Sequence, residues 1–304
     1  MTAALLCSGQ GRQARGMFGM FEGAGAAEPV FAAAASVLGA EPRRRAAEAD
    51  EATLHDNRTG QILCVTRALA AAACLELHGS FLIAGYSVGE MAAWGIAGLW
   101  TSEETVRLTA IRAELMDKAD GGSGGLGFIR GLDRDAVERL VAEHGCSVAI
   151  INPDRLFVIG GARVDVAGCC AKALIVGAAS ARPLAVNVAS HTPRLSSAVE
   201  PFQAAISSSG PAEVAKGRTL VGASDGMVIQ SIAQGSAGLA RQLAHTVDWA
   251  GALEALVERG ADRMLELGPG AALSDMMRRA YPALPTRSLD DFQTLAGARA
   301  WLSA

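Results

Sequence analysis

Residues 85–89 read Gly-Tyr-Ser-Val-Gly, the pattern G-x-S-x-G, and stand between a short apolar run and a helix-forming segment. Residues 81–84 (Phe-Leu-Ile-Ala) predict a buried strand, and residues 90–94 predict the start of a helix. A serine at a tight strand-to-helix turn presents its hydroxyl to a cleft, and the flanking glycines remove side chains that would clash across the bend. The segment therefore predicts an α/β fold with a parallel sheet, in which Ser87 is a candidate nucleophile. The alternative is a glycine-rich turn whose serine only caps the helix.

The composition excludes several classes of protein. Half of the 304 residues are hydrophobic and 19% are charged, which is typical of a compact globular enzyme and not of a disordered chain. The net charge of −4 offers no broad basic surface, so we expect no nucleic acid partner. The longest apolar run, residues 68–75, is too short to span a bilayer, so we expect no membrane partner either.

The six cysteines show no C-x-x-C spacing, and most of them lie in apolar runs. We therefore expect small buried side chains in a reducing compartment, with no metal site and no disulfide framework. The N-terminus has no basic leader, and its apolar run at residues 3–7 is too short for a signal core. Together these features predict a cytoplasmic protein.

The pattern along the chain predicts a small domain inserted into a larger one. A glycine-rich break at residues 121–125 predicts a hinge. The elements predicted after it are a strand, a helix, two strands, a helix and a strand, at 126–130, 133–143, 147–151, 156–159, 164–176 and 182–188. This is the order of the ferredoxin-like β-α-β-β-α-β unit. We therefore expect a small ferredoxin-like subdomain at 125–188. Residues 1–124 and 189–304 would form a large α/β-hydrolase-like catalytic subdomain, with the serine turn as its nucleophile elbow.

A nucleophilic serine needs a general base, and the chain has five histidines. His78 and His144 precede glycines at predicted helix ends, and His55 lies in a charged, irregular stretch, so we expect structural or exposed roles for these three. His245 stands at the end of a predicted helix. His191 follows an apolar strand and precedes a helix, and open α/β sheets place their sites at the C-terminal ends of strands. His191 is therefore the candidate base, with a capping or surface role as the alternative.

Two further features would suit acyl chemistry, and each also has an ordinary structural explanation. Residues 8–11 (Ser-Gly-Gln-Gly) follow the first predicted strand, so their backbone N–H groups could help to form an oxyanion hole or could only close a βα turn. Arg112 lies on a predicted helix among apolar neighbours. It is either a surface residue among charged neighbours such as Arg107 and Glu114, or a buried receptor for an anion, and the spacing does not distinguish the two.

Spaced motifs along residues 8–270 occur in an order that is far more specific than one G-x-S-x-G. They are Gly9-Gln10-Gly11, Gln61, the serine turn with Glu90, Arg112, Asn152-Pro153, Ser190-His191, and Glu-Leu-Gly-Pro-Gly at 266–270. In this order they resemble the malonyl-CoA:acyl-carrier-protein transacylases. That family also carries a ferredoxin-like insert between its serine and its histidine, in agreement with the pattern above.

The resemblance implies a role for each matching residue. Ser87 would be the nucleophile and His191 the general base, with hydroxyl and imidazole within about 3 Å of each other. The backbone N–H groups of Gln10 and Val88 would form the oxyanion hole. Arg112 would hold the malonyl carboxylate through a bidentate pair.

Two more positions follow from the same resemblance. Gln61 would line the acyl pocket. Family members orient the histidine with a main-chain carbonyl, which by position would here belong to His245, where the family usually has Asn or Gln. Because the side chain differs, any role of His245 beyond its carbonyl stays open.

The resemblance also implies a ping-pong reaction without a bound cofactor. Ser87 would take malonyl from malonyl-CoA, and the malonyl-serine would pass it to the thiol of a phosphopantetheine-type arm on an acyl-carrier protein. An arginine receptor would favour malonyl over acetyl, because an acetyl group would leave the buried guanidinium unpaired at a cost of about 1–3 kcal/mol.

The residues beside the serine narrow the resemblance. The fatty-acid enzymes usually have His before the nucleophile and Leu after it, whereas this chain has Tyr86 and Val88, followed by Ala-Ala-Trp-Gly at 92–95. These residues look more like the transacylase (epsilon) subunit of biotin-independent malonate decarboxylase. We therefore expect the acceptor to be the carrier subunit of that decarboxylase, whose arm is a phosphoribosyl-dephospho-CoA group. The alternative is the transacylase of fatty-acid synthesis.

Two other classes stay open. A serine thioesterase or esterase would use an Asp or Glu in a full triad, with the histidine late in the chain. Here no acid stands out at a strand end between Ser87 and His191. A catalytically silent subunit that only docks the carrier is the other class, and the intact set of Ser87, His191 and Arg112 argues against it.

Overall fold

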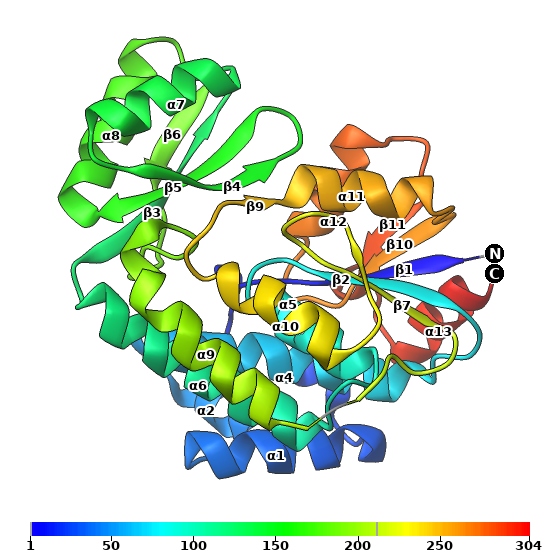
Figure 1. Ribbon diagram of the computed structural model, residues 1–304. Coiled ribbons are helices and arrows are strands. Elements are labelled where there is room, and N and C mark those ends of the chain that lie inside the picture. The colour runs from blue at the N-terminus through cyan, green and yellow to red at the C-terminus, as the bar shows by residue number, and fades with distance from the viewer. Residues whose placement is uncertain (1, 211) are drawn as a thin grey trace.

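The structure is a computed structural model that describes residues 2–210 and 212–304, and these residues form two β-sheets with helices packed around them (Figure 1). The six strands of the larger sheet lie in the order β11 (Thr286–Ser288), β10 (Arg263–Glu266), β1 (Ala3–Cys7), β2 (Phe81–Gly85), β7 (Arg218–Val221) and β8 (Val228–Ile229). Neighbouring strands in it run parallel, except β7 and β8. The mixed α/β fold predicted from the sequence is confirmed.

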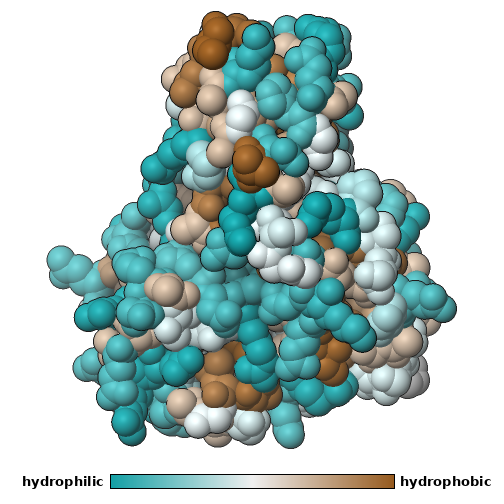
Figure 2. Space-filling model, turned by 90° about the vertical axis from the view of Figure 1, so that its left-hand side faces the viewer, coloured by the Kyte–Doolittle hydropathy of each residue, from teal (hydrophilic) through white to brown (hydrophobic). Residues whose placement is uncertain are grey.

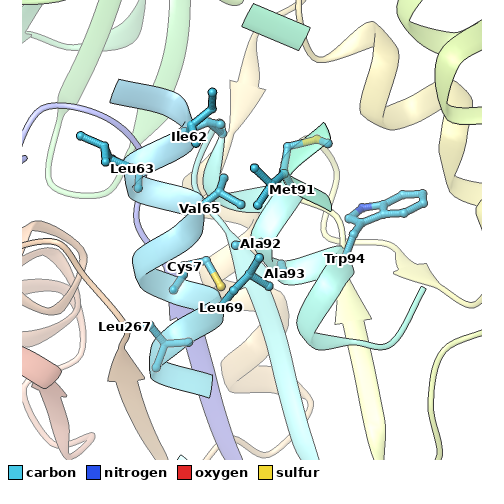
Figure 3. Close-up of a cluster of buried hydrophobic side chains, with 14 of the residues drawn as sticks. Cys7, Ile62, Leu63, Val65, Leu69, Met91, Ala92, Ala93, Trp94 and Leu267 are labelled. Carbon is cyan, nitrogen blue, oxygen red and sulfur yellow. The ribbon is translucent and has the colours of Figure 1, made fainter. Parts of the chain in front are cut away.

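Helices cover both faces of this sheet, because alternate residues of its central strands point to opposite sides. In β1, Leu5 and Cys7 pack in one buried cluster, whereas Ala4 and Leu6 pack in a second. The first cluster includes residues of α4 (Asn57–Leu75), α5 (Gly89–Ile96) and α6 (Ser102–Asp120), and the second includes residues of α11 (Trp249–Glu258) and α12 (Ala272–Ala280). Figure 3 shows α4 and α5 side by side in the first cluster, with Val65 and Leu69 of α4 directed toward α5.

The smaller sheet forms a separate lobe, drawn in green in Figure 1. Its elements follow along the chain as β3 (Gly124–Arg130), α7 (Arg134–Glu143), β4 (Ser147–Asn152), β5 (Leu156–Ala162), α8 (Arg163–Ile175) and β6 (Ser180–Pro183). The spatial order is β6-β3-β5-β4-β9, and the pairs β6–β3, β3–β5 and β5–β4 are antiparallel. Two features differ from the sequence prediction. The last strand ends at Pro183, which has no N–H to donate to the ladder, and a fifth strand joins the sheet.

The fifth strand, β9 (Val247–Asp248), comes from outside residues 125–188 and pairs parallel with β4. It was missed because two residues carry no period-2 pattern. Figure 1 shows the segment before β9 running from α10 (Ile232–Arg241) along the side of the small lobe. The two lobes are therefore joined by this segment as well as by the chain at both ends of 125–188.

The remaining helices complete the larger body. They are α1 (Glu28–Leu38), α2 (Pro42–Glu48), α3 (Glu51–Leu54), α9 (Ser196–Ser208) and α13 (Leu295–Ser303), with 3-10 turns at Gly19–Phe21, Gly25–Ala27, Pro193–Leu195 and Leu289–Asp291. Figure 2 shows the narrow lobe standing on the broader body, with a mainly hydrophilic surface on this face. Among the described residues, no helix is both long and apolar enough to cross a membrane. The six cysteines are buried and not disulfide-bonded.

Candidate active site

A pocket of about 430 Å³ opens between the two lobes, at the carboxyl ends of β1 and β2. The large-sheet side contributes Ser8, Gln10, Ser87 and His191 to its lining, and the small-sheet side contributes mainly apolar residues. The apolar residues that line this side are Leu126, Phe128, Ile150, Leu156, Val158, Leu184 and Val186. Sites of open α/β folds lie at this end of the strands.

The turn that carries Ser87 is tight and depends on its two glycines. Ser87 has a φ of 54°, a left-handed conformation that costs free energy in a residue with a side chain. A Cβ on Gly85 would lie 2.2 Å from the backbone nitrogen of Glu90, and a Cβ on Gly89 would lie 2.1 Å from the Cys7 carbonyl oxygen. Because no larger residue fits at either position, the G-x-S-x-G pattern is a packing requirement of this turn.

Ser87 and His191 lie in hydrogen-bond contact, although 104 residues separate them. The distance from Ser87 Oγ to His191 Nε2 is 2.7 Å. His191 is only 1% exposed, and its backbone N–H donates to the Leu243 carbonyl at 2.8 Å. Serine hydroxyl and imidazole are therefore held in the arrangement that a serine nucleophile and its base require.

The carbonyl that orients His191 belongs to Gln242, and the prediction of His245 is wrong. His191 Nδ1 lies 2.6 Å from the Gln242 carbonyl oxygen, so Nδ1 carries the proton and Nε2 is left to accept one from Ser87. His245 is exposed, and its Nδ1 contacts the Arg241 carbonyl of its own turn at 3.0 Å. The physical reason is that α10 ends at Arg241, so the carbonyls that turn toward His191 come directly after the helix, three residues earlier than predicted.

The surroundings of His191 keep its imidazole neutral. Burial of the ring and, to a smaller extent, the positive charge of Arg112 lower the pKa of His191 to about 3, against the opposing effect of the hydrogen bond to Gln242. A neutral imidazole can accept the serine proton at neutral pH. His191 Nδ1 faces a backbone carbonyl where a Ser-His-Asp triad has a carboxylate.

Arg112 is a buried cation and not a surface residue. It is 1% exposed, and its Nη1 donates to Gln61 Oε1 at 2.6 Å. Its two neighbours in the sequence have other partners, since Arg107 pairs with Glu104 and Glu114 pairs with Arg58. Among the described residues, the Nε and Nη2 atoms of Arg112 have no partner, and no carboxylate lies within ion-pair distance of it.

This arrangement leaves Arg112 able to bind an anion. Burial lowers the pKa of Arg112 to about 10, with the charge of Glu90 opposing the shift, so the guanidinium stays protonated at neutral pH. Two free N–H directions on a planar guanidinium suit a bidentate carboxylate. Gln61 is itself fixed, because its Nε2 donates to Asn57 Oδ1 at 2.7 Å. Arg112 and Gln61 are not among the described residues that line the pocket.

The predicted oxyanion-hole residues flank the serine turn. Val88 is fully buried at the N-cap of α5, where the first N–H groups of a helix have no partner within the helix. Gln10 lines the pocket in the loop after β1. This loop packs directly on the serine turn, since a Cβ on Gly9 would lie 2.8 Å from the Tyr86 carbonyl oxygen. The two backbone N–H groups thus come from neighbouring segments, and their catalytic role stays a prediction.

Two groups of pocket residues were not assigned by sequence reasoning. Asn152 lies in a matched motif, and the structure shows that it lines the pocket, is 3% exposed, and interacts with the Tyr86 side chain. Four arginines, Arg12, Arg130, Arg182 and Arg279, also line the pocket. Their sequence separation hid them, because no linear basic run brings them together.

Comparison with known proteins identifies the family. The acyl transferase domain family matches residues 4–290. The malonyl CoA-acyl carrier protein transacylase of Escherichia coli O157:H7 is 27% identical over 309 aligned positions, which cover 97% of this chain and 98% of the relative. The solved malonyl-CoA:acyl carrier protein transacylase of Xanthomonas oryzae pv. oryzae is 27% identical, with a TM-score of 0.91 and 99% of each chain covered.

A second solved structure is a malonyl-transacylase in complex with a type II PKS acyl-carrier protein, with 27% identity, a TM-score of 0.90 and coverage of 98% of this chain and 99% of the other. Family match, sequence relatives and solved structures agree over almost the whole length of the chain. The chain therefore belongs to the acyl transferase domain family and is an acyltransferase.

Proposed function

We propose that this enzyme transfers malonyl from malonyl-CoA to the thiol of an acyl-carrier protein through a malonyl-Ser87 intermediate. The observation that carries the proposal is a serine–histidine pair at 2.7 Å in the same buried site as an unpaired arginine whose charge acts on that histidine. The names of the relatives and the complex of a malonyl-transacylase with an acyl-carrier protein support the substrate and the partner.

In the first half-reaction, Ser87 Oγ attacks the malonyl thioester carbon while His191 Nε2 takes the hydroxyl proton. The negative charge on the thioester oxygen is stabilised by the backbone N–H groups of Gln10 and Val88. The C–S bond then breaks, and the thiol of coenzyme A leaves with the proton from His191. In the second half-reaction the thiol of the carrier arm gives its proton to His191 and its sulfur attacks the ester carbon of the acyl-serine. The C–O bond to Ser87 then breaks, Ser87 Oγ takes the proton from His191, and malonyl leaves as a thioester of the carrier arm.

Substrate choice in this proposal rests on Arg112 and Gln61. The malonyl carboxylate would take the two free N–H directions of Arg112, while Gln61 holds the third side of the guanidinium. An acetyl group would leave the same buried cation unpaired, which costs about 1–3 kcal/mol. The enzyme should therefore transfer malonyl in preference to acetyl.

The open part of the pocket would hold the arm of the substrate. Asn152 offers both a donor and an acceptor to an amide, and a pantetheine arm contains amides. The apolar residues of the small sheet would pack along its aliphatic part, and the arginines would meet its phosphates. We also propose that the two lobes are the hydrolase-like subdomain (1–124 and 189–304) and the ferredoxin-like subdomain (125–188).

The acceptor protein defines the pathway, and here the comparisons favour the alternative. The relatives are malonyl CoA-acyl carrier protein transacylases, so a transacylase of fatty-acid synthesis fits at least as well as a subunit of malonate decarboxylase. The preference for the decarboxylase carrier rests only on Tyr86, Val88 and residues 92–95. Kinetics with each purified carrier as malonyl acceptor separate the two, since the native carrier should give the higher kcat/KM.

The central test of the proposal is the covalent intermediate. Malonyl-CoA without carrier should add one malonyl group to the intact protein, located by peptide mass spectrometry at Ser87, and added carrier should remove it. A serine thioesterase would instead release CoA continuously without any carrier. Failure to form the adduct in the wild-type protein would overturn the proposed function.

A further inference from the structure

Glu90 is a buried acidic residue directly after the serine turn. It is 2% exposed, and its backbone N–H donates to the Ser87 carbonyl at 3.0 Å. Its side chain extends away from the turn and accepts hydrogen bonds from Gln242 Nε2 and from the Ala223 backbone N–H, the latter at 3.4 Å. One side chain thus connects the turn of the nucleophile with a segment 152 residues further along the chain.

Gln242 is the other end of this connection and serves His191 with a different atom. Its backbone carbonyl accepts from His191 Nδ1 at 2.6 Å, while its side-chain amide donates to Glu90. The residue follows the last residue of α10, and its backbone N–H still bonds to the Gly238 carbonyl at 3.0 Å. Because its carbonyl lies past the end of the helix, it needs another contact to fix its direction.

We propose that Glu90 is a positioning residue for the transfer reaction: it holds the Gln242 side chain, and through it the carbonyl that orients His191 toward Ser87. The inference rests on the proposed function of Ser87 and His191. Glu90 does not line the pocket within the described part of the chain, so it acts through Gln242 and not on the substrate. The hydrogen bond between Glu90 and Gln242 thus links the segments of Ser87 and His191 through side chains, in addition to their backbone contacts.

The surroundings of Glu90 make its acceptor oxygen matter more than its charge. Burial raises the pKa of Glu90 to about 7. The hydrogen bond from Ala223 and the Trp94 side chain oppose this shift, and to a smaller extent Asp225 raises the pKa and Arg112 lowers it. Burial therefore disfavours the charged form of this carboxyl. A neutral glutamine at this position keeps an oxygen that can accept from Gln242, so Glu90→Gln should preserve the contact that Glu90→Ala removes.

The test compares four variants in the formation of malonyl-Ser87 and in steady-state transfer: Glu90→Ala, Glu90→Gln, Gln242→Met, and the double variant Glu90→Ala/Gln242→Met. We expect Glu90→Ala to lower kcat about tenfold or more with KM for malonyl-CoA within about twofold, because misdirecting a general base affects the chemical step. Glu90→Gln should stay within about threefold of the wild type. In the Gln242→Met background, Glu90→Ala should cause no further loss, since residues that act as one unit are not additive.

Three results would overturn the inference while the wild type still forms malonyl-Ser87: full activity of Glu90→Ala, equal losses in Glu90→Ala and Glu90→Gln, or additive losses in the double variant. If Glu90→Ala does not fold, Glu90→Asp replaces it, because the shorter side chain keeps the carboxyl group but is too short to reach Gln242. Ser209→Ala is the control for a simple loss of stability. It removes the acceptor of the Trp100 indole N–H at 2.8 Å, away from the pocket, and should keep its rate. A wild type without the acyl-serine would instead overturn the proposed function.

Discussion

The two walls of the pocket are built differently. On the large-sheet wall, Ser87 and His191 are fixed by backbone hydrogen bonds and by glycine contacts that leave no free space. On the small-sheet wall, the lining is apolar and is accompanied by arginines, of which Arg182 is exposed. The difference indicates a division of labour in the proposed reaction: the first wall supplies the bond chemistry, and the second holds the long arm that brings the acyl group.

Among substitutions in the two walls, that of Ser87 should cause the largest loss of malonyl transfer. Ser87→Ala should lower malonyl transfer by at least about 10⁴-fold, because no other group can form the acyl intermediate. Intact mass after incubation with malonyl-CoA measures the adduct directly. Ser80→Ala, an exposed serine before β2, is the matched control and should be labelled normally. An adduct that persists on Ser87→Ala protein would place the nucleophile elsewhere.

His191→Ala should be next, with a loss of about 10²–10⁴-fold in the rate of acylation. The pKa of about 3 predicts a pH-independent contribution of His191 to the rate between about pH 5 and pH 8, with loss only as the pH falls toward 3. A rapid-mix acylation assay over this range measures it. A rate that halves near pH 6.5 would show that the imidazole titrates in its ordinary range.

The lowered pKa of His191 also affects the free energy of unfolding. The pKa of His191 is lowered in the folded state, so the unfolded chain binds more protons between pH 3 and pH 6.5. The free energy of unfolding should therefore have its full value above pH 6.5. Below that pH it should fall, and this residue should account for at most about 1.4 kcal/mol per pH unit. Urea unfolding of the wild type and His191→Ala at pH 5 and pH 7 measures the difference, which the variant should lack.

Arg112→Ala should reduce malonyl transfer less than Ser87→Ala or His191→Ala, and it should affect malonyl more than acetyl. We expect a loss of about 10–200-fold in malonyl transfer and little change in residual acetyl transfer, because only malonyl carries the carboxylate. Competition between malonyl-CoA and acetyl-CoA reports the ratio. Arg107→Ala, on the same helix but paired with Glu104 at the surface, is the control. Equal losses for both acyl groups would refute the role of Arg112 as a carboxylate receptor.

On the small-sheet wall, Arg182→Ala should raise KM for malonyl-CoA about threefold at low salt and leave kcat unchanged, with the difference shrinking as salt screens the charge. Steady-state kinetics at two salt concentrations test this. Arg134→Ala, whose native residue pairs with Glu138 at the surface of the same lobe, should have no effect. A drop in kcat would remove the division of labour between the walls.

His245→Ala should give the smallest effect, within about twofold of the wild type. Its side chain is exposed, and its Nδ1 contacts the Arg241 carbonyl one turn earlier. Transfer kinetics alone decide this prediction. A large loss in kcat would restore the role that the sequence assigned to His245.

The strand–turn–helix around Ser87 could be predicted because its constraint is local: two glycines and a bend must stand at fixed spacing. Whether Arg112 is buried could not be predicted from its spacing, because both charged and apolar residues lie near it along the helix. Its burial depends on α4 packing beside α6, and that contact is long-range.

The error at His245 has a similar origin. His245 was assigned by its position in the resemblance to the family, and that position does not fix where α10 ends. The carbonyl that faces His191 comes directly after this helix end, and helix ends are the least certain part of a sequence-based assignment. A shift of three residues moved the prediction from Gln242 to a residue on the surface. The strand β9 was missed for a related reason, because its pairing with β4 is set by the fold and not by its two residues.

That strand limits how the protein can be recombined. A chimaera that exchanges only residues 125–188 with a relative would receive a foreign β4 edge against its own β9, which begins four residues after Leu243. A mismatch at this edge would be transmitted directly to the carbonyls around His191. The exchangeable unit of this enzyme is therefore discontinuous and has to include residues 242–248 together with the small lobe.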